Sequence, residues 1–345
     1  MTVDTLNPTF ILPPDREASR PPEARGLARD EVRLLVSEPG SITHARFREL
    51  PHFLHAGDLV VVNDSATLSA AVDARIGRNA LVLHFSTWLD NGLWVVEVRS
   101  TDGHVADWST LECGLEVRLP DGVTATLIEP WLPTGSRLWT ARIDGADSVI
   151  EWLQRKGRPI TYAYVGERWS ADHYTTVFGR RPGSAEMPSA GRPFTDKMVT
   201  ALVTSGITVA PITLHTGVSS PEVGEPPSPE RFAVSGTTAQ LVNATREAGG
   251  RVVAVGTTVT RALETVATED RRIRPGAGWT ELVLGAERPT RIVDGLVTGW
   301  HAPGASHLGL LESVVGARAV RDAYDSALAN GYLWHEFGDS ALLLR

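Results

Sequence analysis

The segment Arg251-Val252-Val253-Ala254-Val255-Gly256-Thr257-Thr258 joins an apolar run to a glycine and then to two hydroxyl residues. A short, uninterrupted apolar run is typical of a strand that is buried on both faces of a sheet. The residues that follow, 258–267, predict a helix. A strand, a glycine turn and a helix form one unit of an α/β fold.

The same alternation extends on both sides of this segment. The run Leu59 to Asn63 predicts another buried strand, and Thr195 and Gly206 predict the start and the end of a helix over 196–204. Alternating units of this length predict a mostly parallel sheet with helices on both faces. The remaining strands are expected at 207–214, 291–297 and 340–344, and the remaining helices at 47–54, 238–248, 306–315 and 318–330.

A different pattern separates the first strand from the rest. Short β-rich runs lie at 81–85, 93–99, 115–119, 123–128 and 138–143, and the pairs Asn91-Gly92 and Asp121-Gly122 are hairpin signals between them. The segment predicts a small antiparallel β-barrel. We therefore expect an inserted barrel domain over 67–156, ending in a helix over 150–156, and an α/β domain built from 1–66 and 157–345. The four prolines of 221–229 predict a loop.

Composition excludes several classes of protein. The chain has 345 residues and a single cysteine, Cys113, so it has no internal disulfide or multi-cysteine zinc site. Its histidines do not pair with acidic residues at metal-ligand spacing, and we expect no metal. The sequence has no apolar run of the roughly 18 residues that span a bilayer and no visible secretory signal. We therefore expect a cytoplasmic protein that is not bound to a membrane. The net charge of −8 gives no general attraction to a phosphate backbone.

The loop after 251–255 is the first candidate ligand site. Gly256 lets a ligand approach the backbone, and the start of the following helix presents N–H groups and the hydroxyls of Thr257 and Thr258 to an anion. Arg261 lies one turn further along and is expected to reach the same anion. The alternative is an ordinary threonine cap with a solvated arginine.

Two other segments carry groups of the same kind. The loop 188–195 places small residues before a helix, and its Phe194 is suited to stacking on a base. His215 and His301 each follow a predicted strand, where a general acid or base would lie. In the alternative interpretation both histidines have structural roles and Trp300 packs in the hydrophobic core.

Several segments of the chain resemble, in order, motifs of one family. Gly57-Asp58-Leu59 with Asn63-Asp64-Ser65 resembles GDLLVxNDT, Tyr174-Thr175-Thr176-Val177-Phe178 resembles YQTVYA, and Pro188-Ser189-Ala190-Gly191 with Phe194-Thr195 resembles PTAGLHFT. Leu214-His215-Thr216-Gly217 resembles the start of LHVGxGTF, and Val255-Gly256-Thr257-Thr258 with Arg261, Leu263 and Glu264 resembles VGTTSVRTLES. Gly278-Trp279-Thr280, then Asp294 and His301 with Pro303, and finally Gly331-Tyr332 with Gly338-Asp339 resemble GWT, VDALxTNFHLP and GYRFxxxGDA.

Together these segments resemble the S-adenosylmethionine:tRNA ribosyltransferase-isomerase family. The resemblance implies an α/β domain with an inserted β-barrel and an enzyme that uses S-adenosylmethionine as co-substrate. Family members transfer and isomerise its ribosyl part onto a 7-aminomethyl-7-deazaguanine base in tRNA, and adenine and methionine leave. The residues expected to act in catalysis are His215 and His301, followed by Asp64 and Asp339. The residues expected to bind the donor are Tyr174, Ser189, Ala190, Gly191, Phe194, Thr195, Gly256, Thr257, Thr258, Arg261 and Trp300.

The chain departs from the family at specific positions. Pro193 replaces the family histidine of AGLHFT, residues 218–222 differ from GxGTFxPV, and 226–233 replace an HxMHxE segment. Because the Gly-Thr-Thr loop and His301 match the family, we infer from the resemblance that S-adenosylmethionine binding is retained and that the acceptor side is changed. Three alternatives to transfer onto tRNA are therefore open: transfer onto a small molecule, cleavage of S-adenosylmethionine, and binding of S-adenosylmethionine or a partner protein without catalysis. The excess of acidic residues predicts weak binding to tRNA.

Overall fold

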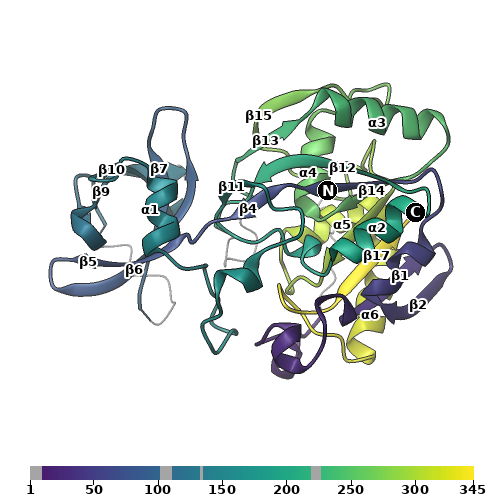
Figure 1. Ribbon diagram of the computed structural model, residues 1–345, viewed down its shortest axis with the longest axis horizontal. Coiled ribbons are helices and arrows are strands. Elements are labelled where there is room, and N and C mark those ends of the chain that lie inside the picture. The colour runs from purple at the N-terminus through teal and green to yellow at the C-terminus, as the bar shows by residue number, and fades with distance from the viewer. Residues whose placement is uncertain (1–9, 102–110, 133–134, 219–226) are drawn as a thin grey trace, which may run out of the picture.

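The computed structural model describes residues 10–101, 111–132, 135–218 and 227–345. It contains a nine-stranded sheet with helices and, to one side of it, a closed six-stranded barrel (Figure 1). The expected α/β class with an antiparallel barrel is confirmed. A two-stranded sheet, β4 (Ser65–Thr67) with β11 (Arg181–Ser184), lies between the two bodies.

The large sheet is mixed rather than mostly parallel. Its order is β15-β13-β12-β3-β14-β16-β17-β1-β2. The four central strands are parallel: β12 (Thr208–His215), β3 (Leu59–Asn63), β14 (Val252–Val255) and β16 (Gly295–Gly299). The strand β17 (Ser340–Leu344) is antiparallel to β16 and parallel to β1 (Arg33–Glu38). The outer strands β2 (Ser41–Arg46), β13 (Glu230–Val234) and β15 (Gly276–Thr280) pair antiparallel.

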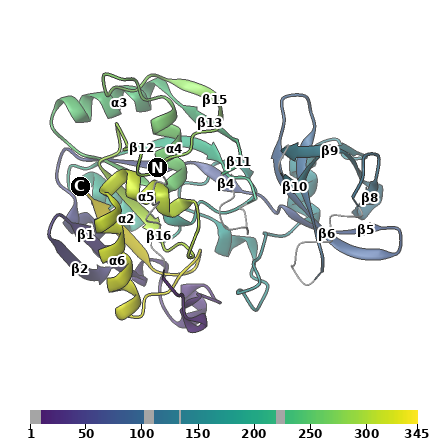
Figure 2. The same cartoon turned by 180° about the vertical axis from the view of Figure 1, so that it is seen from behind.

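Both faces of the central strands are buried, as the apolar runs predict. Val252 and Ala254 of β14 belong to the core on one face, and Val253 and Val255 belong to the core on the other. This alternation follows from the two-residue period of a strand. The α-helices that accompany the large sheet are α2 (Asp196–Thr204), α3 (Gly236–Glu247), α4 (Thr257–Thr265), α5 (His307–Val315) and α6 (Ala317–Ala329). The rear view shows α5 packed beside α6 (Figure 2).

The barrel closes in the order β10-β7-β6-β5-β8-β9. Its turn at Asp121-Gly122 has φ values of 60° and 77°, the left-handed conformation that a primed turn requires. The helix α1 (Val149–Lys156) contributes Trp152 and Leu153 to the barrel core. The strands are β5 (Ala71–Ile76), β6 (Asn79–Trp88), β7 (Trp94–Arg99), β8 (Glu116–Arg118), β9 (Thr124–Leu132) and β10 (Gly135–Asp144). All six lie inside the expected insert, whose boundaries at 67 and 156 stay a prediction.

Three expected elements differ from the structure or lie outside it. The strand expected from Arg291 begins only at Gly295, because the backbone N–H groups of 291–293 donate to the carboxylate of Glu264 at 2.8–3.1 Å instead of to a strand. The helix expected over 47–54 is a 3-10 helix, Phe47–Phe53, with Pro51 inside it. Most of the proline loop over 221–229 lies outside the described residues.

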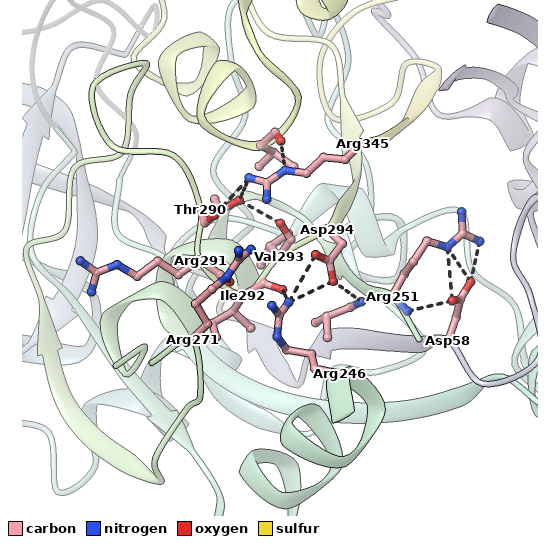
Figure 3. A network of polar contacts seen from close by, with 12 residues as sticks. Asp58, Arg246, Arg251, Arg271, Thr290, Arg291, Ile292, Val293, Asp294 and Arg345 are labelled. Carbon is pink, nitrogen blue, oxygen red and sulfur yellow. Dashed lines mark hydrogen bonds and ion pairs between the residues drawn. The ribbon is translucent and has the colours of Figure 1, made fainter. Parts of the chain in front are cut away.

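Two ion pairs hold the starts of the central strands, one at the buried Asp58 and one at the half-buried Asp294 (Figure 3). Asp58 is 3% exposed and accepts from the backbone N–H of Arg251 at 3.0 Å and from its guanidinium at 2.6 Å. Asp294 accepts from the backbone N–H of Val252 at 3.0 Å and from Arg246 at 3.2 Å. Burial acts to raise the pKa of Asp58, but hydrogen bonds from Arg251 and from the backbone outweigh it and lower that pKa overall.

We expect Asp58→Ala to lower the free energy of unfolding by about 2–4 kcal/mol, because it leaves the partly buried Arg251 guanidinium and the backbone N–H groups of His55 and Arg251 without their acceptor. Urea unfolding measures the loss. The matched control is Asp322→Ala, which removes an exposed pair with Arg318 and should cost less than about 0.5 kcal/mol.

The effect should also depend on pH. Because the pKa of Asp58 is lower in the folded state, its stabilisation is present above about pH 4 and fades as the pH falls through the folded value. An Asp58→Ala loss that is as small as that of the control, or unchanged in acid, would contradict this role.

Candidate active site

A cavity of about 460 Å³ lies at the carboxyl ends of β14 and β16. This is the edge at which open α/β sheets bind ligands. The turn after β14 supplies Gly256, Thr257 and Thr258, and the turn after β16 supplies Trp300 and His301. Ser189 and Ala190 also line the cavity, so the structure brings three of the predicted segments together.

Gly256 shapes the turn after β14. Its φ of 95° is a conformation that side chains disfavour, and a Cβ there would lie 3.4 Å from the Cβ of Ala190. Gly256 is also the N-cap of α4, and no side chain caps this helix. The N–H groups of the first turn of α4 therefore meet no capping side chain and can bind an anion in the cavity.

Arg261 lines the cavity but is held by the protein. Its Nη1 donates to Glu230, its Nε donates to the carbonyl of Leu282 at 3.0 Å, and its Nη2 donates to the carbonyls of Ser228 and Thr280 at 3.3 Å. The alternative of a solvated arginine is wrong, since Arg261 is 5% exposed. Burial raises the pKa of Glu230, while Arg261 opposes that rise.

His301 lies in the cavity beside a second histidine that the sequence did not predict. Its ring stacks on that of His307 with centroids 4.5 Å apart and planes 1° apart, and its Nε2 lies 3.1 Å from Thr298 Oγ1. Burial, with His307 nearby, places the pKa of His301 well below its ordinary value, and burial lowers the pKa of His307 to about 4. Both rings are neutral at pH 7 and can accept a proton.

His215 is not among the residues that line the cavity. Its Nδ1 lies 2.7 Å from Ser65 Oγ, and its ring is 5.1 Å from that of Trp88 in the barrel. Burial lowers its pKa to about 4. Residues 216–218, which follow it, do line the cavity, so His215 lies behind the wall, between the barrel and the sheet.

The two candidate aspartates also lie outside the lining. Asp64 accepts a hydrogen bond from Thr213 at 2.6 Å and pairs with Arg181 at 3.2 Å. Asp339 is 5% exposed and accepts from the backbone N–H groups of Arg33 at 2.8 Å and Leu333 at 2.9 Å. These contacts join strand ends and loops, and they give neither carboxylate a place in the cavity.

The remaining predicted donor-binding residues divide into two groups. Tyr174 and Trp300 line the cavity, although both are buried. Phe194 packs against other phenylalanines at 1% exposure, Thr195 caps α2, and Gly191 lies in a 3-10 turn. None of these last three lines the cavity.

The sequence did not predict an acidic and aromatic part of the lining. Tyr162 donates a hydrogen bond to Glu186, and Tyr164 donates one to Glu336. His335 stacks on Tyr164 with centroids 4.1 Å apart and has a φ of 71°, which is uncommon for a residue with a side chain. These residues come from three separate segments, so no local motif could have indicated them.

The cavity is acidic overall. Glu186, Glu230 and Glu336 line it, and Arg261 is the only arginine or lysine among the described lining residues. Glu230 pairs with Arg261, and Glu186 and Glu336 accept hydrogen bonds from Tyr162 and Tyr164. Within the described part of the chain, no three His, Cys, Asp or Glu side chains are grouped to hold a metal ion. No helix in the same ranges has the length and apolarity needed to cross a bilayer.

The fold and site define a class: an α/β protein with an inserted barrel and a ligand cavity at the carboxyl edge of its central strands. The chain belongs to the queuosine biosynthesis protein family, whose model matches residues 7–343. It is 33% identical to the S-adenosylmethionine:tRNA ribosyltransferase-isomerase of Moorella thermoacetica, over 97% of this chain and 98% of the relative. It is also 33% identical, over the full length of both, to the enzyme of that name from Novosphingobium aromaticivorans.

A solved structure agrees with this assignment. The crystal structure of S-adenosylmethionine tRNA ribosyltransferase from Thermotoga maritima matches with a TM-score of 0.55 and 26% identity, over 97% of this chain and 99% of that one. The resemblance stated from the sequence motifs is therefore confirmed.

The pair of Arg261 and Glu230 generates a prediction. Arg261→Ala should cost about 3 kcal/mol or more in the free energy of unfolding, because it leaves the Glu230 carboxylate buried without its cation. Adding Glu230→Gln should restore part of this loss, and urea titrations of the parent, of each single variant and of the double variant measure it. A double variant as unstable as the sum of the two single changes would contradict the coupling.

Proposed function

We propose that this chain transfers and isomerises the ribosyl part of S-adenosylmethionine, as the names of its relatives state, and that adenine is lost in this reaction. The observation that carries the proposal is the uncapped N-terminus of α4 behind Gly256, which opens into the cavity. The donor carries a carboxylate, and helix N-termini bind carboxylates through free N–H groups.

The cavity suits the rest of the donor. Its volume of about 460 Å³ lies within the range of small-molecule sites. The donor's ammonium and sulfonium are cations, and carboxylates and aromatic faces stabilise both. We propose that Thr257 and Thr258 bind the donor carboxylate and that Arg261 acts by holding Glu230 beside the donor ammonium.

We propose His301 as the proton acceptor. The sulfonium acidifies the neighbouring C5′ protons, so a neutral base can remove one, after which adenine leaves. His301 lines the cavity, and burial lowers its pKa, so its ring is unprotonated at pH 7 and free to take up a proton, although the same shift makes it a weaker base. The lining of the cavity does not include His215, Asp64 or Asp339, so these residues would affect the reaction only indirectly, by holding the residues that do line it.

The names of the relatives favour tRNA as the acceptor over a non-catalytic binder. One observation favours a small molecule, or cleavage of the donor, as a second candidate: the chain carries net charge −8.

His301→Ala should slow adenine release from S-adenosylmethionine by about 10²–10⁴-fold, the usual contribution of a positioned base. Chromatography of released adenine measures the rate, and calorimetry measures whether the donor still binds. His52→Ala changes an exposed histidine and serves as the control. Parental turnover in His301→Ala would place the base elsewhere.

The acceptor is tested by incubating the protein with donor and tRNA carrying the deazaguanine base, then measuring the mass of the tRNA. A gain that matches the ribosyl-derived ring is the expected result. Adenine release without any change in tRNA mass would instead support the second candidate.

A further inference from the structure

The second histidine of the cavity, His307, has no role in the function proposed above. It is the first residue of α5, and its ring lies parallel to that of His301, with centroids 4.5 Å apart and planes 1° apart. Both residues line the cavity. Within the described ranges, no hydrogen bond joins the ring of His307 to another residue, so its stack on His301 is the one specific contact of this ring.

The other contacts of His301 fix its backbone and one edge of its ring. Its N–H donates to the hydroxyl of Tyr324 at 3.2 Å, and its carbonyl accepts from Nε1 of Trp334 at 3.0 Å. Its Nε2 lies 3.1 Å from Oγ1 of the buried Thr298. The torsion that turns a histidine ring is broad, so packing against the face of the ring decides its angle. The residue that packs against this face is His307.

The hydrogen bond to Thr298 determines which nitrogen of His301 can take up a proton. A neutral imidazole carries one N–H and one bare nitrogen, and the hydrogen bond of one nitrogen sets the state of the other. With Nε2 donating to Thr298, Nδ1 is the bare nitrogen, and no residue in the described part of the chain hydrogen-bonds to it. A rotation of the ring that breaks this bond would let the proton exchange between the two nitrogens.

His307 is suited to hold this ring rather than to react. It begins α5, and the N-terminus of a helix disfavours a positive charge. Burial acts in the same direction and lowers the pKa of His307 to about 4. Two imidazolium rings at this distance would repel each other, so the pair has room for one proton. When His301 takes up that proton, His307 stays neutral.

We propose that His307 is a positioning residue for the proton transfer: its ring, stacked on His301, keeps the hydrogen bond to Thr298 formed and Nδ1 bare. This inference rests on the proposed function, in which His301 is the proton acceptor. In the step that it serves, a C–H bond at C5′ of S-adenosylmethionine breaks, an N–H bond forms at Nδ1, and the electron pair stays on carbon. His307 neither gains nor loses a proton.

Two variants separate stacking from proton chemistry. His307→Phe keeps a planar ring and removes both nitrogens, whereas His307→Leu removes the ring and keeps an apolar side chain. Adenine release at saturating S-adenosylmethionine should fall by about 10–100-fold in His307→Leu, the effect of a misplaced reacting group, with KM unchanged. His307→Phe should keep most of the rate. His52→Leu changes an exposed histidine and should keep the parental rate.

Magnetic resonance of ¹⁵N-labelled histidine tests the same role without any ligand. The signals of His301 are those that His301→Ala lacks. At pH 7 the parent and His307→Phe should each show one protonated and one bare nitrogen for this ring. In His307→Leu the two signals should move towards each other, because the nitrogens then exchange their proton. Thr298→Val, which removes the hydroxyl and keeps the shape of the side chain, should give the same averaged signals.

The two measurements together decide the inference. Slow release and averaged signals in His307→Leu, with both nearly parental in His307→Phe, support the positioning role. A parental rate or parental signals in His307→Leu would overturn it, as would a His307→Phe variant that is as slow as His307→Leu. His307→Met takes the place of His307→Leu if urea unfolding shows that the latter is unstable. A wild type that releases no adenine, or a His301→Ala variant at the parental rate, would overturn the proposed function, and the signals would still decide whether His307 holds the ring.

Discussion

The structure depends on the placement of one short strand. The strand β14 is buried on both faces, and the backbone N–H groups at its start are held by Asp58 and Asp294, each of which also binds an arginine. Its register with β3 pairs Val252 with Leu59. Because the start of β14 and both of its faces are held, the position of its carboxyl end at Gly256 is fixed as well. The helix α4 begins there, with the N–H groups of its first turn toward the cavity. The ion pairs at the amino ends of the central strands thus help to fix the turn that lines the cavity at their carboxyl ends.

Much of this frame could be predicted because local signals and the global fold agree. The runs at β3, α2 and β17 have the same bounds in the structure as in the prediction. The outer strands were missed for physical reasons. Most of β2 is exposed, and β15 contains two glycines, so neither shows a buried apolar run. Their strand geometry comes from pairing with a neighbour along the sheet, which a local pattern does not encode.

The candidate site was predictable where a turn follows a strand and not where the partners are distant in sequence. Gly256, Thr257, Thr258 and His301 could be predicted to lie together because strand ends converge on one edge of the sheet, and all four line the cavity. Arg261 was found as well, but its partner Glu230 belongs to a strand that was not expected. The acidic and aromatic part of the lining joins residues 162–164, 186 and 336, and only the folded chain brings them together.

Burial acts in opposite directions on the two kinds of titratable group around the cavity. It lowers the pKa of His301 and His307 and raises the pKa of Glu230 and Glu336, so it favours the neutral form of each. The histidines therefore stay uncharged at pH 7 and add no positive charge against the carboxylates. Any cation that enters the cavity meets carboxylates without competition from histidinium, and its charge in turn favours their ionised form. The charge of the ligand and the protonation of the lining are thereby coupled, because a bound cation lowers the pKa of the neighbouring carboxyl groups and so favours the ionised form that binds it.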